Sequence, residues 1–462
     1  MTAVSFEEFK GEAMAMGEKT PIAVSNAAAA SRMAIGEALT NLVSVDVNLD
    51  RIILSANWMG ACGVKGQDAA LYDGVSAASS FCQELGVSIP VGKDSLSMKT
   101  SWKDQAGEDK TVVSPVSLVV SAAAPVYDIR NNLLPMFAES VRDSSLLLID
   151  LGHGKDRLGG SVYSQVTQRF DSVTPDMEDP KELKKFLELI RSLSAKGAIL
   201  AYHDRSDGGL AAALCEMMFA SHVGVEIVAD ALVSKDRTLN QALFNEELGA
   251  VIQVARGRAA EVERDFEAAG MGWSLKYLGN LTQDDHLNIY LEGKCVLSED
   301  RVDLQKAWNE VSWQIARMRD NPECADSEYE LISDKHNGGL VLTMGFDPEE
   351  NLAAPFINTG VRPKVAILRE QGVNSQNEMA SAFLQAGFDA VDVHMTDLLE
   401  GRAKLADFVG LAACGGFSYG DVLGAGADGR RPFCTTPNCR ARSAASSKRR
   451  QRLRWESATA AR

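Results

Sequence analysis

Two residues on one predicted helix carry oxygen atoms suited to a metal ion. Glu37 and Asn41 stand four positions apart in the segment GEALTN, so a helix would place both side chains on one face. Two hard oxygen ligands of this kind suit Mg²⁺, which usually takes one or two protein ligands and fills its other positions with water and phosphate. The same spacing also occurs on ordinary solvated helices, so the pattern alone leaves both interpretations open.

A second polar segment, HDRSDGG at 203–209, lies between the apolar run AILAY and the helical pattern GLAAALCEMMF. A strand end, a glycine turn and a helix N-terminus together offer backbone N–H groups to a phosphate. In this interpretation Asp204 is available for a metal and Ser206 for a phosphate oxygen. The alternative is a structural turn in which Asp207 caps the helix. Capping accounts for Asp207 but not for the other two residues, so both interpretations stay open.

The segment GKDS at 92–95 is similar to the end of a phosphate loop. It lacks the earlier glycine, and Asp94 stands where Ser or Thr should follow the lysine, so it is not a Walker motif. We predict a tight polar turn between strands. Lys93 could still face a nucleotide there, and we keep Lys93 and Asp94 as candidate ATP-binding residues.

Cys414, Gly415 and Gly416 stand at the end of a third predicted strand. No following helix presents the thiol as a nucleophile, and cysteine is often a small buried residue. We interpret Gly415 and Gly416 as a close-approach backbone site that could donate N–H groups to an oxyanion.

Apolar patterning predicts the domains that hold these residues. Residues 1–130 begin with helical spacing and continue with β-rich runs, which indicates an α+β domain. Residues 143–320 alternate strands and helices, an order that suggests an α/β unit. Residues 321–362 are polar and are predicted to form an exposed connector. Residues 363–426 have a βαβ pattern that predicts a parallel sheet, with too few strands for a complete doubly wound domain.

Composition excludes several classes of protein. The 462 residues are 45% hydrophobic and 24% charged, which allows several globular domains. No run reaches the roughly 18 apolar residues of a membrane helix, and the first thirty residues carry acidic groups where a signal peptide would need a basic start and an apolar centre. We therefore expect a cytoplasmic protein and no membrane partner. The eight cysteines are scattered and predict neither a zinc site nor disulfides. The net charge of -16 argues against nucleic-acid binding.

The last 35 residues do not match the rest of the chain. From Asp428 to Arg462 there are ten Lys and Arg and two acidic residues, so this segment carries +8 and the preceding residues carry -24. The segment has almost no apolar periodicity, and we predict that residues 427–462 are a disordered basic tail. A basic arm for nucleic acid is the less favoured alternative because aromatic residues are not interleaved with the charges.

Long segments of the chain resemble formylglycinamide ribonucleotide amidotransferase (phosphoribosylformylglycinamidine synthase) in its large, single-chain form. The resemblance runs almost continuously from about residue 8 to 426 and rests on these segments: KTPIAVSNAAAASRMAIGEALTN, LSANWMGACG, VSIPVGKDSLSMKTSW, AYHDRSDGGL, LFNEELGAVIQV, MRDNPECADSEY, RPKVAILREQGVNSQNEMA and ACGGFSYGDVLGAG. So many long matches in one order make chance implausible.

The resemblance implies two domains of the aminoimidazole ribonucleotide synthetase type, N and C, followed by an incomplete class I glutamine amidotransferase domain of flavodoxin-like fold. In that family ATP phosphorylates the formamide oxygen of formylglycinamide ribonucleotide, and ammonia from glutamine displaces the phosphate during purine synthesis. Mg²⁺ neutralises the transferring phosphoryl group. The resemblance further implies that Glu37, Asn41 and Asp204 bind Mg²⁺, that Ser206 touches ATP, and that the complete enzyme is monomeric.

Two other functions remain to be weighed against this one. One of the family's two pseudo-symmetric sites is thought to hold a nucleotide for structure, so a non-catalytic nucleotide-holding module stays open. A stand-alone kinase or cyclo-ligase of the same superfamily is disfavoured, because it should lack the extension from Arg362 to Gly426.

The resemblance also implies that the chain matches only the C-terminal part of the family and departs from it after Gly426. The family continues with GWAK and later with GVCNGCQ, whose first cysteine is the glutaminase nucleophile. Back-translating the tail and reading each codon one base early can restore GWAKTILYNPEL from Asp428 to Cys439 and LGVCNGCQ from Arg454 to Arg462. We therefore hypothesise a single-base slip near Ala427.

The glutaminase Cys, His and Glu are absent, and we expect no glutamine hydrolysis and no complete synthase reaction from this chain alone. Turnover in a glutaminase assay would overturn this expectation.

Overall fold

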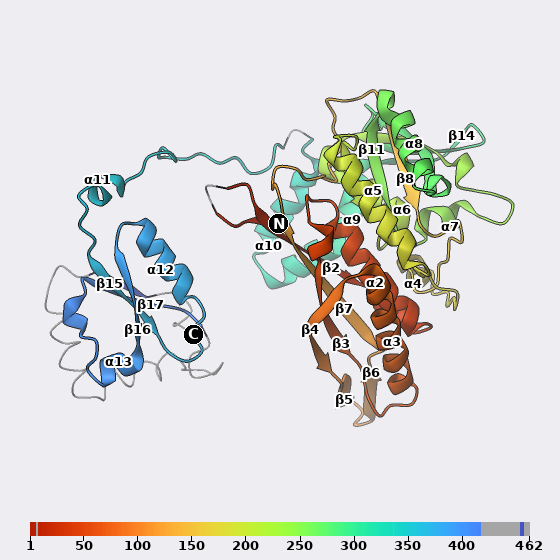
Figure 1. The fold of residues 1–462 in the computed structure, drawn as a ribbon. Helices are drawn as coiled ribbons and strands as arrows, with labels where there is room; N and C mark the ends of the chain where they lie inside the picture. The colour runs from red at the N-terminus through yellow and green to blue at the C-terminus, as the bar shows by residue number, and fades with distance from the viewer. Residues whose placement is uncertain (6–7, 336, 417–452, 457–462) are drawn as a thin grey trace. The chain divides into compact units, whose positions relative to one another are not determined.

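The computed structural model describes residues 1–5, 8–335, 337–416 and 453–456. The chain divides into a first unit, Met1–Asn337, and a second unit, Gly338–Arg462. The first unit contains two large sheets with their helices and a separate two-stranded sheet, and the second unit contains a parallel sheet (Figure 1). Within the described residues no helix is both long and apolar enough to span a membrane.

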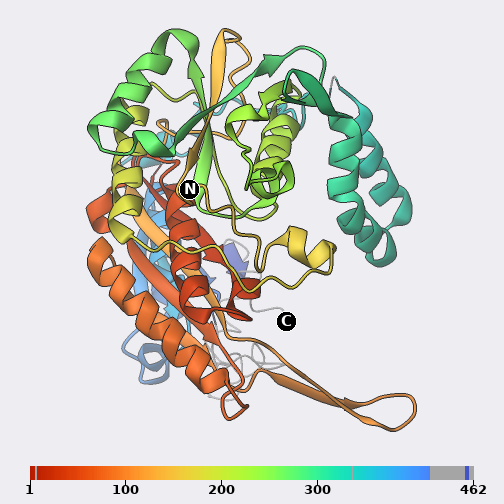
Figure 2. The same ribbon diagram turned by 90° about the vertical axis from the view of Figure 1, so that its right-hand side faces the viewer.

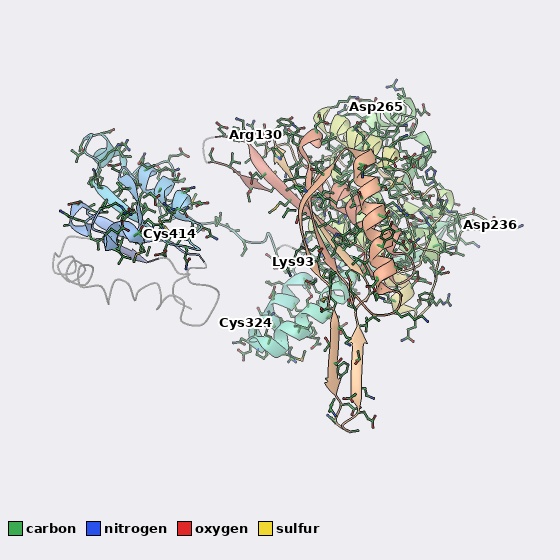
Figure 3. The ribbon with its side chains drawn as sticks, turned by 60° about the horizontal axis from the view of Figure 1, so that its bottom comes forward. Lys93, Arg130, Asp236, Asp265, Cys324 and Cys414 are labelled. Atoms are coloured by element: carbon green, nitrogen blue, oxygen red, sulfur yellow. The ribbon has the colours of Figure 1, made fainter. Side chains whose placement is uncertain are left out.

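The first sheet has the strand order β1-β2-β7-β3-β4, and all neighbours are antiparallel except β3 and β4. Helices α2 and α3 lie side by side and cover this sheet, whereas the hairpin of β5 and β6 extends away from it (Figures 1 and 3). The elements are β1 (Thr2–Ala3), β2 (Gly11–Glu18), α1 (Thr20–Ala23), α2 (Ala27–Leu42), β3 (Ile53–Met59), α3 (Gln67–Leu85), β4 (Ser88–Ser95), β5 (Lys99–Lys103), β6 (Asp109–Val113) and β7 (Ser117–Val126).

Helix α2 forms where the sequence predicts a helix. It starts after Asn26, whose side chain accepts a hydrogen bond from the N–H of Ala29 at 3.0 Å and so caps the helix. Its many alanines have small side chains, so the helix can lie close to β2. The predicted turn at 92–95 is wrong, because these residues belong to β4. Gly92 allows β4 to lie close to β3, because an added Cβ would lie only 2.3 Å from the Ala56 carbonyl oxygen.

The second sheet has the order β14-β13-β10-β12-β8-β11-β9. Its elements are β8 (Ser144–Asp150), α4 (Val162–Val166), α5 (Pro180–Ala195), β9 (Ala201–Asp204), α6 (Gly209–Ser221), β10 (Gly224–Val228), α7 (Leu239–Phe244), β11 (Gly249–Ala255), α8 (Ala259–Ala268), β12 (Leu275–Thr282), β13 (His286–Leu291), β14 (Lys294–Asp300), α9 (Arg301–Arg319) and α10 (Pro322–Glu330). The strand and helix order suggested an α/β unit, and in its sheet β11 inserts between β8 and β9 and is antiparallel to both. The sheet is therefore antiparallel apart from the pair β10 and β13.

Strand β8 shows how the first unit holds together. Its residues are all buried and alternate between two apolar clusters. Leu147 and Ile149 join a cluster that also contains Phe186 of α5 and Met33 of α2. Leu146 and Leu148 join the other cluster, together with residues of α6. Because the first cluster includes residues from the helices of both sheets, the two layers share one core.

The polar stretch expected to be a connector begins with a helix, α10. Tyr329 of α10 stacks on Trp313 of α9 with ring centroids 4.2 Å apart, and the Trp313 Nε1–H donates to Asp326 at 2.9 Å. The two helices lie side by side as a pair (Figure 2). Aromatic packing at one turn therefore stabilises a segment in which apolar periodicity is weak.

The second unit has the parallel strand order β16-β15-β17-β18. Its elements are α11 (Ala354–Ile357), β15 (Lys364–Arg369), α12 (Gln376–Gln385), β16 (Asp389–His394), α13 (Met395–Leu399), β17 (Gly410–Ala413) and β18 (Leu453–Glu456). The predicted βαβ crossover is confirmed by the parallel pairing of β15 with β16 and β17. The mixed α+β and α/β class predicted from the sequence is likewise confirmed.

Strand β18 corrects part of the prediction for the basic tail. Residues 453–456 pair in parallel with β17 instead of being disordered. Backbone pairing depends little on side-chain type, so a free sheet edge can recruit a strand that has no apolar periodicity. The rest of the predicted tail beyond Ala427, including most of the segment used for the reading-frame hypothesis, lies outside the described residues.

Gly17 on β2 fits directly against α2. A methyl group added to it would lie 2.1 Å from the Ala34 carbonyl oxygen and 2.6 Å from the Ala38 nitrogen. Because both are backbone atoms, strand and helix would have to separate. We expect Gly17→Ala to lower the free energy of unfolding by about 1–3 kcal/mol, the usual cost of overpacking. Urea denaturation measures this, with Gly257→Ala as the control because nothing lies within 4 Å of an added methyl there. Equal losses in both variants would contradict the steric explanation.

Candidate nucleotide and metal site

Glu37 of α2 meets the loop that follows β9, as the proposed site requires. Its Oε1 accepts a hydrogen bond from the hydroxyl of Ser206, and its Oε2 accepts one from the N–H of Glu18 at 2.8 Å. The carboxylate also lies 3.4 Å from the ammonium of Lys19. Helix α2 and strand β9 are far apart in the sequence, and these contacts bring their polar residues into one cluster. We call Lys19, Glu37, Asp204, Ser206, Asp207 and Glu246 the acidic cluster.

Asp204 ends strand β9 and is 9% exposed. Next to it, His203 approaches Glu216 of α6 with Nε2 3.0 Å from the carboxylate, and its Nδ1 lies 2.7 Å from the Asp204 carbonyl oxygen. Burial opposes the charged imidazole, but the bond to Glu216 and the charge of Asp204 outweigh it and raise the pKa of His203. The histidine therefore ties the end of β9 to α6.

The turn after β9 differs from the prediction at Asp207. The N-cap of α6 is Gly208 in the left-handed conformation (φ 76°), and no side chain caps the helix. Asp207 forms an ion pair with Lys19 instead. The N–H of Gly208 donates to Glu246 at 3.0 Å, so a carboxylate distant in sequence satisfies the backbone group at the N-cap position.

Glu246 also accepts a hydrogen bond from the N–H of Val162 at 2.8 Å, and its carboxylate lies 3.8 Å from the Lys19 ammonium. Burial raises the pKa of Glu37, Asp204 and Glu246 in spite of the nearby lysine. Burial likewise opposes the charged form of Lys19, but its carboxylate neighbours outweigh it and raise the pKa of the lysine. One lysine thus faces several carboxylates, and the cluster has an excess of negative charge.

Beneath the cluster, Arg205 anchors the loop. It is 1% exposed, its Nε donates to the Glu247 carbonyl oxygen at 2.6 Å, and its Nη2 donates to Asp150 at 2.6 Å. Asp150 is itself 2% exposed; burial opposes its ionisation, but Arg205 and backbone N–H groups more than compensate and lower its pKa. Neighbouring residues of the loop thus serve different purposes: Asp204, Ser206 and Asp207 join the acidic cluster, whereas Arg205 stabilises the fold.

The remaining predicted residues of the first unit form no hydrogen bond or ion pair with the acidic cluster within the described residues. Asn41 is exposed, one helical turn beyond Glu37, and makes no side-chain hydrogen bond within the described residues. Lys93 and Asp94 are exposed on the edge strand β4, where the Lys93 ammonium lies 3.3 Å from the Ser95 hydroxyl (Figure 3). Among the described residues, no group of three or more His, Cys, Asp or Glu side chains is arranged to hold a metal ion.

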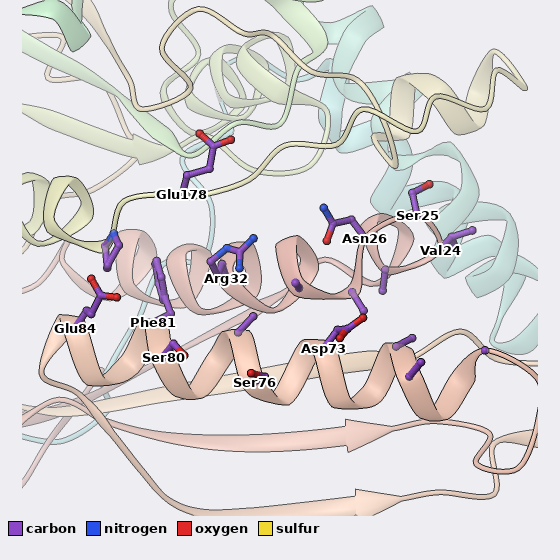
Figure 4. A pocket seen from close by; sticks show the side chains of 18 residues that line it. Val24, Ser25, Asn26, Arg32, Asp73, Ser76, Ser80, Phe81, Glu84 and Glu178 are labelled. Atoms are coloured by element: carbon purple, nitrogen blue, oxygen red, sulfur yellow. The ribbon is translucent and has the colours of Figure 1, made fainter.

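A pocket of about 650 Å³ lies away from the acidic cluster, between α2, α3 and the segment that carries Glu178 (Figure 4). Its walls are mainly alanine and serine, and Arg32, its arginine, is already paired with Asp176 through bonds of 2.7 and 2.6 Å. The lining of this pocket therefore offers a phosphate no unpaired cationic side chain.

In the second unit, Gly416 makes the close backbone approach that the sequence suggested. It has φ 151° and forms an isolated bridge with Val373, and an added Cβ would lie 2.3 Å from the Gly372 carbonyl oxygen. The Gly415 carbonyl accepts a hydrogen bond from Ser375 at 3.2 Å. Donation of N–H groups to an oxyanion by these glycines stays a prediction.

Two members of the cluster, Lys19 and Glu246, were not predicted from the sequence. Lys19 stands in the segment GEKTP, and Glu246 in FNEELG, where a lysine or glutamate is unremarkable. Adjacent acidic residues in the otherwise apolar FNEELGAVIQV were the available signal, since a buried carboxylate needs a partner.

Sequence models of three domain families match the chain in order. Residues 1–125 match the FGAR-AT PurM N-like domain, where FGAR-AT is formylglycinamide ribonucleotide amidotransferase. Residues 144–292 match the C-terminal domain of AIR synthase related proteins, and residues 362–453 match the CobB/CobQ-like glutamine amidotransferase domain. The chain belongs to the formylglycinamide ribonucleotide amidotransferase family. Membership predicted from sequence motifs is thereby confirmed.

Solved structures are similar to this family member in fold. Phosphoribosylformylglycinamidine synthase II from Thermotoga maritima has a TM-score of 0.50 at 11% identity and covers 84% of this chain and 52% of its own. PurL from T. maritima complexed with FGAR has a TM-score of 0.49 at 12% identity, over 65% and 47% of the two chains. Hydrogenase maturation protein HypE in complex with ATP has a TM-score of 0.45 at 12% identity, over 65% and 88%. The chain spans about half the length of the T. maritima proteins.

Proposed function

We propose that the chain serves the ATP-dependent conversion of formylglycinamide ribonucleotide to formylglycinamidine ribonucleotide, with glutamine-derived ammonia, in cytoplasmic purine biosynthesis. The observation that carries the proposal is the contact between Glu37 and Ser206, which joins α2 to the phosphate-type loop after β9. Three family models in one order support the same reaction. They also make a purely nucleotide-holding role the less favoured alternative, because synthetase and amidotransferase parts occur together.

The residues present fit a magnesium ion. Glu37 and Asp204 supply carboxylate oxygens and Asn41 an amide oxygen, the donor types that Mg²⁺ prefers. The excess negative charge of the buried cluster is what a divalent cation would offset. We propose Glu37, Asp204 and Asn41 as the residues that would hold Mg²⁺, with water and phosphate oxygens as the other ligands. When bound, the ion would neutralise charge on the triphosphate.

The chain's own residues prepare this site in three ways. The Glu18 N–H fixes the second oxygen of Glu37, so the carboxylate presents a defined edge. The buried Arg205 holds the loop on its inner side, and Ser206 lies on the side of the acidic cluster, where we propose that its hydroxyl contacts a phosphate oxygen. Glu246 accepts a hydrogen bond from the backbone N–H of Gly208, the N-cap residue of the following helix. We also propose Lys93 and Asp94 as more distant nucleotide contacts and a monomeric complete enzyme.

Metal removal tests the proposal. We expect the chain to bind ATP in the presence of MgCl₂ and to lose at least about 100-fold in affinity when EDTA removes the metal, because the carboxylates then repel the triphosphate. Isothermal titration calorimetry measures the affinity, and a second titration adds formylglycinamide ribonucleotide to the ATP-saturated chain. Asp265→Asn is the control, since Asp265 pairs with Lys196 outside the cluster. Equal ATP affinity with and without Mg²⁺ would contradict the proposal.

A further inference from the structure

Lys19 is a buried ammonium with an unusual set of partners. Its side chain is 2% exposed, and Nζ lies 3.4 Å from Glu37, 3.8 Å from Glu246 and 3.3 Å from the Ser206 hydroxyl. Its closest partner is the carboxylate of Asp207, with which it forms a hydrogen-bonded ion pair. The lysine directly follows β2, so it brings a positive charge from the edge of the first sheet to the loop after β9.

The partners of Lys19 differ in how firmly they are held. The Glu37 and Glu246 side chains are 13% and 3% exposed, and both accept hydrogen bonds from backbone N–H groups. The Asp207 side chain is 62% exposed, and within the described residues Lys19 is its one ion-pair partner. Asp207 can therefore turn into water without leaving a second buried group unpaired, whereas the two glutamates cannot.

We propose that Lys19 binds a phosphate group of the nucleotide and that Asp207 is an internal anion that holds this position until the phosphate replaces it. The inference rests on the proposed function, because it assigns a ligand within the same site. A lysine ammonium binds phosphate as a point charge, and a phosphate oxygen is an anion that can take the place of a carboxylate. The left-handed Gly208 and Gly209 leave the loop beside Asp207 without side chains that would block the approach.

Because Asp207 competes with the phosphate for Lys19, it lowers the apparent affinity of the site for the nucleotide. The site can bind phosphate only when Asp207 has left Lys19. The measured affinity is therefore reduced in proportion to the fraction of molecules in that open state. Removing the charge of Asp207 should therefore strengthen nucleotide binding. A purely structural ion pair predicts the opposite sign, because breaking it would loosen the loop and weaken binding.

The test is calorimetric titration of Mg²⁺-ATP into the full chain and its variants. We expect Asp207→Asn to tighten binding by about threefold to tenfold, the effect of removing one nearby like charge. Lys19→Met should weaken binding by about 10- to 100-fold, which corresponds to one charge-assisted hydrogen bond. Lys19→Arg, which keeps the charge, should retain most of the affinity. Asp46→Asn is the matched control, because Asp46 pairs with Arg191 outside the cluster and should leave the affinity unchanged.

The variants differ in how safely they fold. Lys19→Met leaves buried carboxylates without their cation, so circular dichroism must establish that it is folded. Asp207→Asn alters an exposed side chain and keeps the test decisive if Lys19→Met does not fold. Unchanged or weaker binding by Asp207→Asn, with the wild type binding normally, overturns the assignment of Lys19 and leaves the proposed function intact. A wild-type chain that binds no Mg²⁺-ATP overturns both.

Discussion

Asp204→Asn is expected to weaken Mg²⁺-ATP binding by about 100-fold or more, close to 3 kcal/mol, without lowering the free energy of unfolding. Asp204 is buried at the end of β9, and burial raises the pKa of its carboxyl group. The charged carboxylate is thus unfavourable for the fold in the absence of a cation. An amide of the same size removes that cost and removes the anionic ligand at the same time.

Two measurements on each variant separate binding from folding. Calorimetry gives the affinity for Mg²⁺-ATP, and urea denaturation in the absence of nucleotide gives the free energy of unfolding. Asp265→Asn, in an exposed ion pair, should change neither quantity appreciably. If Asp204→Asn binds normally but unfolds more easily, Asp204 is a structural residue, and the metal-binding role proposed for it is wrong.

The site could be predicted from the sequence where its chemistry is local. Helical spacing placed Glu37 on the face of α2, and the strand followed by a glycine turn placed Asp204 and Ser206 at the end of β9. These are short-range patterns, and backbone periodicity determines them. The meeting of Glu37 with Ser206 was expected only from the family resemblance, since the two residues lie 169 positions apart.

Long-range pairing explains the residues that were missed or misassigned. Lys19 contacts Asp207 across 188 positions, so local patterning left Asp207 with the simpler role of a helix cap. Strand β11 enters between β8 and β9 from a later part of the chain, and no local feature of either strand reveals this. The segment at 92–95 has turn-forming residues, yet its backbone pairs with β3 because Gly92 allows the strands to approach closely.

Arg205→Met is expected to lower the free energy of unfolding by about 3–5 kcal/mol, because it leaves the buried Asp150 without a cation. The arginine also donates to the carbonyl oxygens of Glu247 and Leu248, at 2.6 and 3.2 Å. Arg319→Met is the control; Arg319 pairs with Asp320 at the surface, and its loss should cost less than about 1 kcal/mol.

A second substitution shows whether the loss comes from the unpaired carboxylate. Adding Asp150→Asn to Arg205→Met removes the buried charge, so the double variant should recover part of the stability.

The pH dependence of the unfolding free energy tests the role of the buried carboxylate independently. In the wild type Arg205 helps hold the pKa of Asp150 below its usual value, so the pair stabilises the fold at neutral pH. This contribution is lost as the pH falls below the pKa of an ordinary carboxyl group and through the lowered pKa of Asp150. Without Arg205, burial should raise that pKa, and protonation should then relieve the destabilised fold. The difference in unfolding free energy between wild type and Arg205→Met should therefore shrink between pH 7 and about pH 4. A difference that stays constant over this range, or a double variant no more stable than Arg205→Met, would show that lost packing and backbone bonds, and not the buried charge, cause the instability.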